Sequence, residues 1–185
     1  TGGAGDQGIM VGYACDETPE LLPKEVVLAR RFNQYIYNKF PFDGKTQVTL
    51  SGDKVTKVVA SFQNASQKEL KTLATEFFKT DDIELFLNPC GDWSIGGFDA
   101  DAGLTGRKLA VDNYGPSIPV GGGAFSGKDP SKVDRSAAYA ARRIAVDYLK
   151  KFKAHEVYVR LAYAIGWNEP LERTAIIDGK AVAIP

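Results

Sequence analysis

The clearest pattern of apolar and polar positions in the chain lies between residues 130 and 151. Apolar side chains recur there at intervals of three and four residues, which places them along one face of a helix. We expect that face to pack on a sheet, and its members are Val133, Ala137, Ala140, Ala141, Ile144, Tyr148 and Leu149. The pattern therefore predicts an amphipathic helix that covers a sheet.

Two earlier helices are predicted from their start signals. Residues 18–23 contain the start signals of a helix that is expected to run to about residue 40, with Pro23 suited to its first turn. Ser66 and Glu69 have the spacing of a capping box, which predicts a helix from there through Lys79.

Short runs of β-branched and other apolar residues predict the strands. Two pairs of runs read as hairpins, one over Ser-Gly-Asp-Lys at 51–54 and one over Asp178-Gly179, a favoured two-residue turn. The predicted strands are 46–50, 55–62, 83–87, 108–111, 156–165, 172–177 and 180–184. Hairpins that alternate with long helices predict an α+β fold of two sheet-plus-helix sandwich units, which we expect to pack directly against each other. We place the first unit at 1–90, with an N-terminal glycine loop, and the second at 91–185.

The composition narrows the possible partners. Lysine plus arginine and aspartate plus glutamate each number 23, so no overall field favours nucleic acid or an anionic membrane. No apolar stretch approaches the roughly 20 residues that span a bilayer, and we expect a cytoplasmic protein. Cys15 and Cys90 lie far apart without metal-binding spacing, and the single histidine, His155, is assigned no role.

The strongest candidate for chemistry is the glycine-rich run at 121–135. Its flexible glycines can bring backbone N–H groups close to an anion, and the start of the following helix is electropositive. Lys128, Lys132 and Arg135 add positive charge, while Asp134 offers a hard oxygen ligand for a divalent ion. The spacing from Gly122 to Lys128 is that of a nucleotide-binding P-loop, but Asp129 follows where Ser or Thr should hold magnesium, so the ordinary P-loop interpretation fails. A glycine-rich turn before a helix with solvated charges remains the alternative.

Three other patches contain residue types suited to polyphosphate chemistry. Asp6 lies among glycines, Asp43-Gly44-Lys45 precedes a strand, and Asp101 and Arg107-Lys108 bracket Ala-Gly-Leu-Thr-Gly. Together with the glycine run these patches match, in order, the motifs of one family. The chain resembles S-adenosylmethionine synthetase, and the matching motifs are Gly3 to Gly8 with Gly12-Tyr13-Ala14, Gly103 to Lys108, Gly121 to Arg142, and Tyr163 to Gly166 with Glu169-Pro170.

The resemblance implies a methionine adenosyltransferase. In this family the sulfur of methionine attacks C5′ of ATP and displaces triphosphate, which is then hydrolysed to pyrophosphate and phosphate. The family uses Mg²⁺ and is activated by K⁺. Carried over by position, the resemblance implies that Lys128 and Lys132 bind the triphosphate and that Asp134 binds magnesium. It implies that ATP is contacted by Arg107, Lys108, Asp43 and Lys45, and that Ala124 lines the nucleotide pocket. Asp101 would lie between ATP and methionine, and Asp6 would bind the methionine or ribose part of the product. Lys128, Lys132 and Arg107 would act directly on the reacting groups.

The chain also departs from the family pattern. A segment with His-Pro-Asp-Lys that normally comes first is not present, Asp92-Trp93 replaces an Arg-Phe pair, and Val120 replaces a histidine. We therefore expect part of a synthetase that works as a homodimer or as a hetero-oligomer with a chain carrying the missing segment. The alternative is a noncatalytic nucleotide-binding or regulatory relative.

Overall fold

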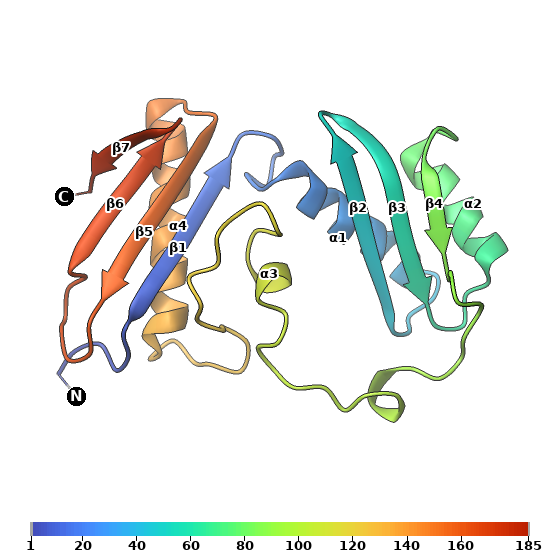
Figure 1. Ribbon diagram of the computed structural model, residues 1–185, viewed down its shortest axis with the longest axis horizontal. Helices are drawn as coiled ribbons and strands as arrows, with labels where there is room; N and C mark the ends of the chain where they lie inside the picture. Colours follow the sequence, from blue (N-terminus) through green and yellow to red (C-terminus); the bar gives the residue numbers. More distant parts are fainter. Residues whose placement is uncertain (1, 185) are drawn as a thin grey trace. The chain divides into compact units, whose positions relative to one another are not determined.

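The computed structural model describes residues 2–184 and has the predicted α+β class, with two separate sheets and helices packed on them (Figure 1). Contacts divide it into two compact units, one of residues up to Pro23 together with those from Leu104, the other Lys24–Gly103. This grouping differs from a single division after residue 90. The reason is that the first strand of the chain pairs with a strand more than 140 residues later.

The first unit is a four-stranded antiparallel sheet with one long helix. Its strands are β1 (Gly8–Cys15), β5 (Glu156–Tyr163), β6 (Glu172–Ile177) and β7 (Lys180–Ala183), in the order β1-β5-β6-β7. Helix α4 (Val133–Phe152) runs along one face of this sheet (Figure 1). The predicted hairpin over Asp178-Gly179 is confirmed, and β1 is a strand that was not predicted from the sequence.

The buried face of α4 differs in detail from the predicted one. Val133, Ala137, Ala141 and Leu149 are buried as expected, but Ala140 is exposed. Ala138 and Ala145 are buried in addition. The helix also begins at Val133 rather than at Pro130, because Asp129 and the two residues after it form a separate turn.

The strand predicted at 108–111 is absent, because Lys108 caps the short helix α3 (Leu109–Asp112) and the other three residues lie in it. The backbone N–H groups of Asp112 and Asn113 donate to the carbonyls four residues earlier, of Lys108 and Leu109. Apolar content over four residues cannot distinguish a strand from a single helical turn, so the local hydrogen bonds decided it.

The second unit is a three-stranded sheet covered on one face by two helices. Its strands are β2 (Gly44–Ser51), β3 (Lys54–Phe62) and β4 (Glu84–Leu87), with β2 and β3 forming the predicted hairpin and β4 parallel to β3. Helices α1 (Lys24–Tyr37) and α2 (Gln67–Phe78) supply the rest of its core, which consists of Phe32, Ile36, Val58, Ala60, Phe62, Ala65, Leu70, Leu73 and Ala74.

The predicted capping box of α2 is present. The Glu69 backbone N–H donates to the Ser66 hydroxyl, and the Glu69 carboxylate accepts from the Ser66 backbone N–H. A short 3-10 helix, η1 (Gly97–Asp99), follows the sheet. Across residues 2–184, no helix combines the length and the apolar character that crossing a bilayer requires.

Candidate functional site

The glycine loop of the first unit lies between β1 and the start of α4. A methyl group at Gly121 would lie 1.9 Å from the carbonyl oxygen of Ile9, and one at Gly123 would lie 2.4 Å from Asp134 Oδ1. A larger residue at 121 would therefore collide with the backbone of β1, and one at 123 would displace the Asp134 side chain. The loop is held against the edge strand on one side and against the first turn of α4 on the other.

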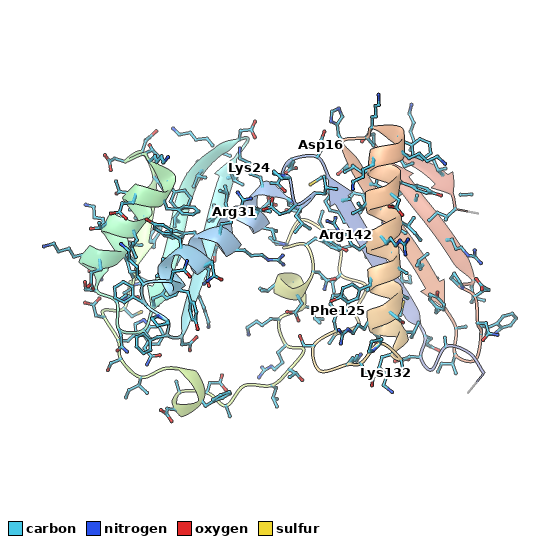
Figure 2. All side chains as sticks on the ribbon, turned by 180° about the vertical axis from the view of Figure 1, so that it is seen from behind. Asp16, Lys24, Arg31, Phe125, Lys132 and Arg142 are labelled. Atoms are coloured by element: carbon cyan, nitrogen blue, oxygen red, sulfur yellow. The ribbon has the colours of Figure 1, made fainter. Side chains whose placement is uncertain are left out.

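The charged residues at the start of α4 are arranged around this loop. Lys128 Nζ donates to Asp134 Oδ2 at 2.5 Å, with 33% of the Lys128 side chain and 13% of the Asp134 side chain exposed. The Arg135 guanidinium donates to the Lys128 carbonyl. Lys132 is the N-cap residue of α4 and is exposed, and Figure 2 shows its side chain at the N-terminal end of the helix. The loop and helix start thus bring together a carboxylate and several cations.

Asp129 has a local structural role. Its Oδ1 accepts hydrogen bonds from the Ser131 hydroxyl and from the Ser131 backbone N–H, the latter at 2.8 Å. These two bonds hold the pKa of the Asp129 carboxyl below its ordinary value, and the bond from the Ser131 hydroxyl has the larger effect. Asp129 therefore stays ionised and closes the turn that precedes α4.

A second loop, 104–108, packs against the glycine loop. A methyl group at Gly106 would lie 2.8 Å from Cβ of Ala124, and one at Gly127 would lie 3.3 Å from Thr105 Oγ1. The Ser126 hydroxyl also donates to Asp112 Oδ2 at 3.1 Å. Arg107 and Lys108, both exposed, directly follow the packed residues, so the structure places their backbone beside the loop that holds Lys128.

Neither Ser126 nor Asp112 was singled out from the sequence. A serine inside a glycine run and an aspartate in an apolar run carry no signal of pairing, since the two lie 14 positions apart. Only the folding of one loop onto the other brings the two side chains together.

The N-terminal motif, Gly3 to Gly8, lies beside the loop that follows β5 in the same unit. The Ala4 backbone bonds to the loop that follows β5, donating to the Trp167 carbonyl and accepting from the Gly166 N–H, both at 2.8 Å. Asp6 is exposed, and its Oδ1 accepts from the Gln7 N–H. A cavity of about 490 Å³ lies here, lined by Gly3, Ala4, Gly5, Ser131, Val133, Ser136, Ala137, Ala140, Tyr163 and Asn168.

The remaining candidates, Asp43, Lys45 and Asp101, belong to the second unit. Asp43 Oδ2 accepts from the Gly97 N–H at 3.1 Å, and Asp101 Oδ1 accepts from the Gly103 N–H at 2.8 Å. Lys45 is exposed on β2, opposite Ser61 of β3. Within this unit Asp43 is therefore hydrogen-bonded to the segment around Gly97.

Comparison with known proteins concerns both halves of the chain. A model of the central domain of S-adenosylmethionine synthetase matches residues 1–93, and a model of the C-terminal domain matches residues 95–180. The chain belongs to the S-adenosylmethionine synthetase family.

Individual relatives agree with this membership. S-adenosylmethionine synthase of Helicobacter hepaticus is 45% identical over 91% of this chain and 50% of that protein, and the enzyme of Thermus thermophilus is 45% identical over 91% and 49%. A solved structure described as an unusual S-adenosylmethionine synthetase from Campylobacter jejuni has a TM-score of 0.83 and 31% identity, covering 99% of this chain and 55% of that one. The chain spans about half the length of the curated relatives it matches.

The two domain models of the synthetase family meet near residue 94. Contacts nevertheless group β1 with the C-terminal part of this family member. The difference arises because a strand can pair with a distant segment while its sequence neighbours stay in another sheet.

Asp92 has partners within the second unit. Its Oδ1 accepts from the Gln67 backbone N–H, in the first turn of α2, at 3.0 Å, and from Asn88 Nδ2 at 3.3 Å. A carboxylate at a helix N-terminus satisfies an otherwise unpaired donor and complements the helix dipole. Asp92 therefore gives α2 an additional cap.

The donor set for a metal is limited. Within residues 2–184 no group of three or more His, Cys, Asp and Glu side chains comes close enough to hold an ion. Mg²⁺ in phosphate-binding sites is commonly held by one or two carboxylates together with phosphate oxygens and water. Asp134 fits one such ligand position, and Lys128, which pairs with it, would have to share or leave that position.

Proposed function

We propose that this chain forms part of a methionine adenosyltransferase, which makes S-adenosylmethionine from ATP and methionine and cleaves the triphosphate to pyrophosphate and phosphate. The observation that carries the proposal is the packing of two loops in the first unit. It puts Lys128, Asp134 and the backbone of Arg107 around one short stretch of glycine-rich chain. The family membership of both halves supports the same reaction.

The reaction suits a site made of cations rather than of acids and bases. A lone pair on the methionine sulfur forms the new bond to C5′ of ATP while the bond between C5′ and O5′ breaks, so no proton has to be removed from the thioether. The leaving triphosphate gains negative charge, which preplaced cations stabilise. A lysine about 4 Å from a phosphate oxygen contributes on the order of 4 kcal/mol at an intermediate dielectric, before desolvation is counted.

Each candidate residue then has a binding role. Lys128 and Lys132 would hold the triphosphate, with Lys132 also close to methionine, and Arg107 would neutralise charge on the leaving group. Asp6 would bind the methionine or ribose part of the product. The residues proposed to contact ATP are Asp43, Lys45, Asp101, Arg107, Lys108 and Ala124.

Mg²⁺, when bound, would neutralise triphosphate charge and orient its oxygens. Asp134 would supply its protein ligand from this chain. When Lys128 exchanges Asp134 for a phosphate oxygen, it would leave the carboxylate open to the ion. K⁺ is proposed as an activator on family grounds alone, and no residue of this chain is assigned to it.

The partner is proposed to be a second copy or a different chain that carries the His-Pro-Asp-Lys segment. The chain matches about half of each relative, so residues outside the matched part would contribute to the complete site. Methionine and ATP are the proposed small-molecule partners.

A reconstitution assay tests this function. The purified chain is mixed with a polypeptide carrying the His-Pro-Asp-Lys segment, and S-adenosylmethionine and phosphate are measured with ATP, methionine, Mg²⁺ and K⁺. We expect little synthesis by the chain alone and clear synthesis in the mixture, with Lys132→Ala reducing it by about 100-fold or more, as for loss of an electrostatic contact in a transition state.

The outcomes separate the two hypotheses. Binding of ATP without turnover in every mixture would support a regulatory relative instead of an enzyme. Full activity of the chain without any partner would contradict the proposed division of the site.

A further inference from the structure

Gln63, the residue directly after β3, joins two separate segments of the second unit through its side-chain amide. Its Nε2 donates to the Ser94 carbonyl at 2.9 Å, and its Oε1 accepts from the Asp43 backbone N–H at 3.4 Å. The Gln63 backbone N–H donates to the Asp43 carbonyl at 2.9 Å. The side chain therefore connects the start of β2 to the segment after β4.

Three further contacts close the same region. Asp43 Oδ2 accepts from the Gly97 N–H at 3.1 Å, and the Asn64 N–H donates to the Trp93 carbonyl at 2.9 Å. A methyl group at Gly96 would lie 2.5 Å from Gln63 Oε1, so the chain at Gly96 packs tightly on the amide. Segment 93–97 is thus held at four points, and the Gln63 side chain makes one of these contacts directly and packs on another.

This arrangement requires a group that donates at one end and accepts at the other. The amide of glutamine does both, whereas a carboxylate only accepts and would face the Ser94 carbonyl with negative charge. A hydrocarbon side chain of the same length would leave both backbone groups without this partner. The residue type is therefore explained by the two segments that it connects.

We propose that Gln63 is a positioning residue for ATP binding, because it fixes 43–45 and 93–97 relative to each other. The inference rests on the proposed function, which assigns ATP contacts to Asp43 and Lys45. Gln63 itself touches backbone and is not assigned to substrate. Substituting Gln63 should therefore change the affinity for the nucleotide and leave the glycine loop of the first unit unchanged.

The test compares Gln63→Glu with a matched control in the same sheet, Gln47→Glu. Gln47 is exposed on β2, so the control makes the same chemical change at a solvated position. The chain and both variants are each mixed with the polypeptide that carries the His-Pro-Asp-Lys segment, and calorimetry measures binding of Mg·ATP and of Mg·tripolyphosphate. Hydrogen exchange measures protection of the Gly97 N–H without ligand.

We expect Gln63→Glu to bind Mg·ATP about tenfold more weakly and to exchange the Gly97 N–H about tenfold faster, the size of effect expected for one lost hydrogen bond plus repulsion. Tripolyphosphate affinity should stay within about twofold, a split that general destabilisation of the chain would not produce. Gln47→Glu should change none of the three values by more than about twofold.

The outcomes distinguish the two levels of the proposal. If the parent chain binds Mg·ATP and Gln63→Glu matches Gln47→Glu in affinity and exchange, the positioning role is overturned while the proposed function stands. If the mixture with the parent chain binds neither ligand, the proposed function fails and the inference falls with it. Should Gln63→Glu not fold by circular dichroism, Gln63→Met, which removes both bonds without adding charge, is judged by the same criteria.

Discussion

The ammonium of Lys128 neutralises the largely buried carboxylate of Asp134 in the first turn of α4. Only 13% of the Asp134 side chain is exposed, and the ion pair offsets the cost of desolvating a charge there. Both residues are also proposed to bind the triphosphate and its metal. Stability and function thus draw on the same two side chains.

Removing the cation of this pair should destabilise the first unit. We expect Lys128→Met to lower the free energy of unfolding by about 1–3 kcal/mol, since the Asp134 carboxylate loses its charged donor. Urea unfolding followed by circular dichroism measures the change. Lys132→Met, four residues later and exposed, is the control and should stay within about 0.5 kcal/mol of the parent. Equal effects of the two substitutions would contradict a stabilising pair.

His155 offers a pH-dependent measurement at the residue scale. Its Nδ1 lies 2.8 Å from Asp16 Oδ2, and this hydrogen bond, together with the negative charges of Asp16 and Asp178, raises the pKa of the imidazole above its ordinary value of 6.5. Because the folded pKa is raised, the contact stabilises the fold fully below the unfolded pKa and is lost as pH rises through the folded pKa.

An NMR titration can check the direction. The chain has a single histidine, so its ring signals need no assignment. We expect the pKa of His155 to lie above 6.5 in the parent and to fall in Asp16→Asn. A pKa at or below 6.5 in the parent would show that the Asp16 contact does not form in solution.

At the scale of elements, the ends of helices were specified more locally than their buried faces. The capping box of α2 was predictable because Ser66 and Glu69 satisfy each other's backbone within one turn. In contrast, α4 packs on β5, which follows it directly, and on β1, which lies more than 110 residues earlier in the chain. Which of its alanines are buried depended on how these two strands lie beneath it. Ala140 faces solvent although it fits the apolar spacing.

The cap of α2 should be measurable. Ser66→Ala removes the hydroxyl that accepts from the Glu69 N–H, and we expect a loss of about 1 kcal/mol in the free energy of unfolding. Thr72→Ala, in the interior of the same helix, is the matched control because its hydroxyl bonds only to the Lys68 carbonyl of its own helix. A loss at Ser66 no larger than that at Thr72 would contradict a capping contribution.

At the scale of the whole molecule, the two units differ in continuity. The second is a single stretch with its own core around Phe32, Ile36 and Phe62, whereas the first is assembled from both ends of the chain. A contiguous unit can close its core without distant segments. The strand β1, in contrast, has its ladder partner only in β5.

Two fragments test this division. We expect residues 24–103 alone to fold with a cooperative thermal transition and dispersed NMR signals, because both sheet and covering helices are included. In a fragment of 1–90, residues 8–15 should give the narrow signals of an unfolded segment, because β5 is missing. A protected β1 in the 1–90 fragment would contradict the observed grouping.

The sequence by itself determined the elements that close locally and the family to which the chain belongs. The capping box, the two hairpins and the glycine run depend on residues within a few positions of each other, so their chemistry can be read in order along the chain. The motifs at 103–108 and 121–135 carried the resemblance for the same reason.

Only the tertiary structure decided which distant segments meet. The pairing of β1 with β5, the bond between Ser126 and Asp112, and the amide of Gln63 between Asp43 and Ser94 join residues 14 to more than 140 positions apart. Such contacts depend on the burial of apolar surface across the whole unit. That burial is non-directional and leaves no short-range pattern from which an individual partner can be identified.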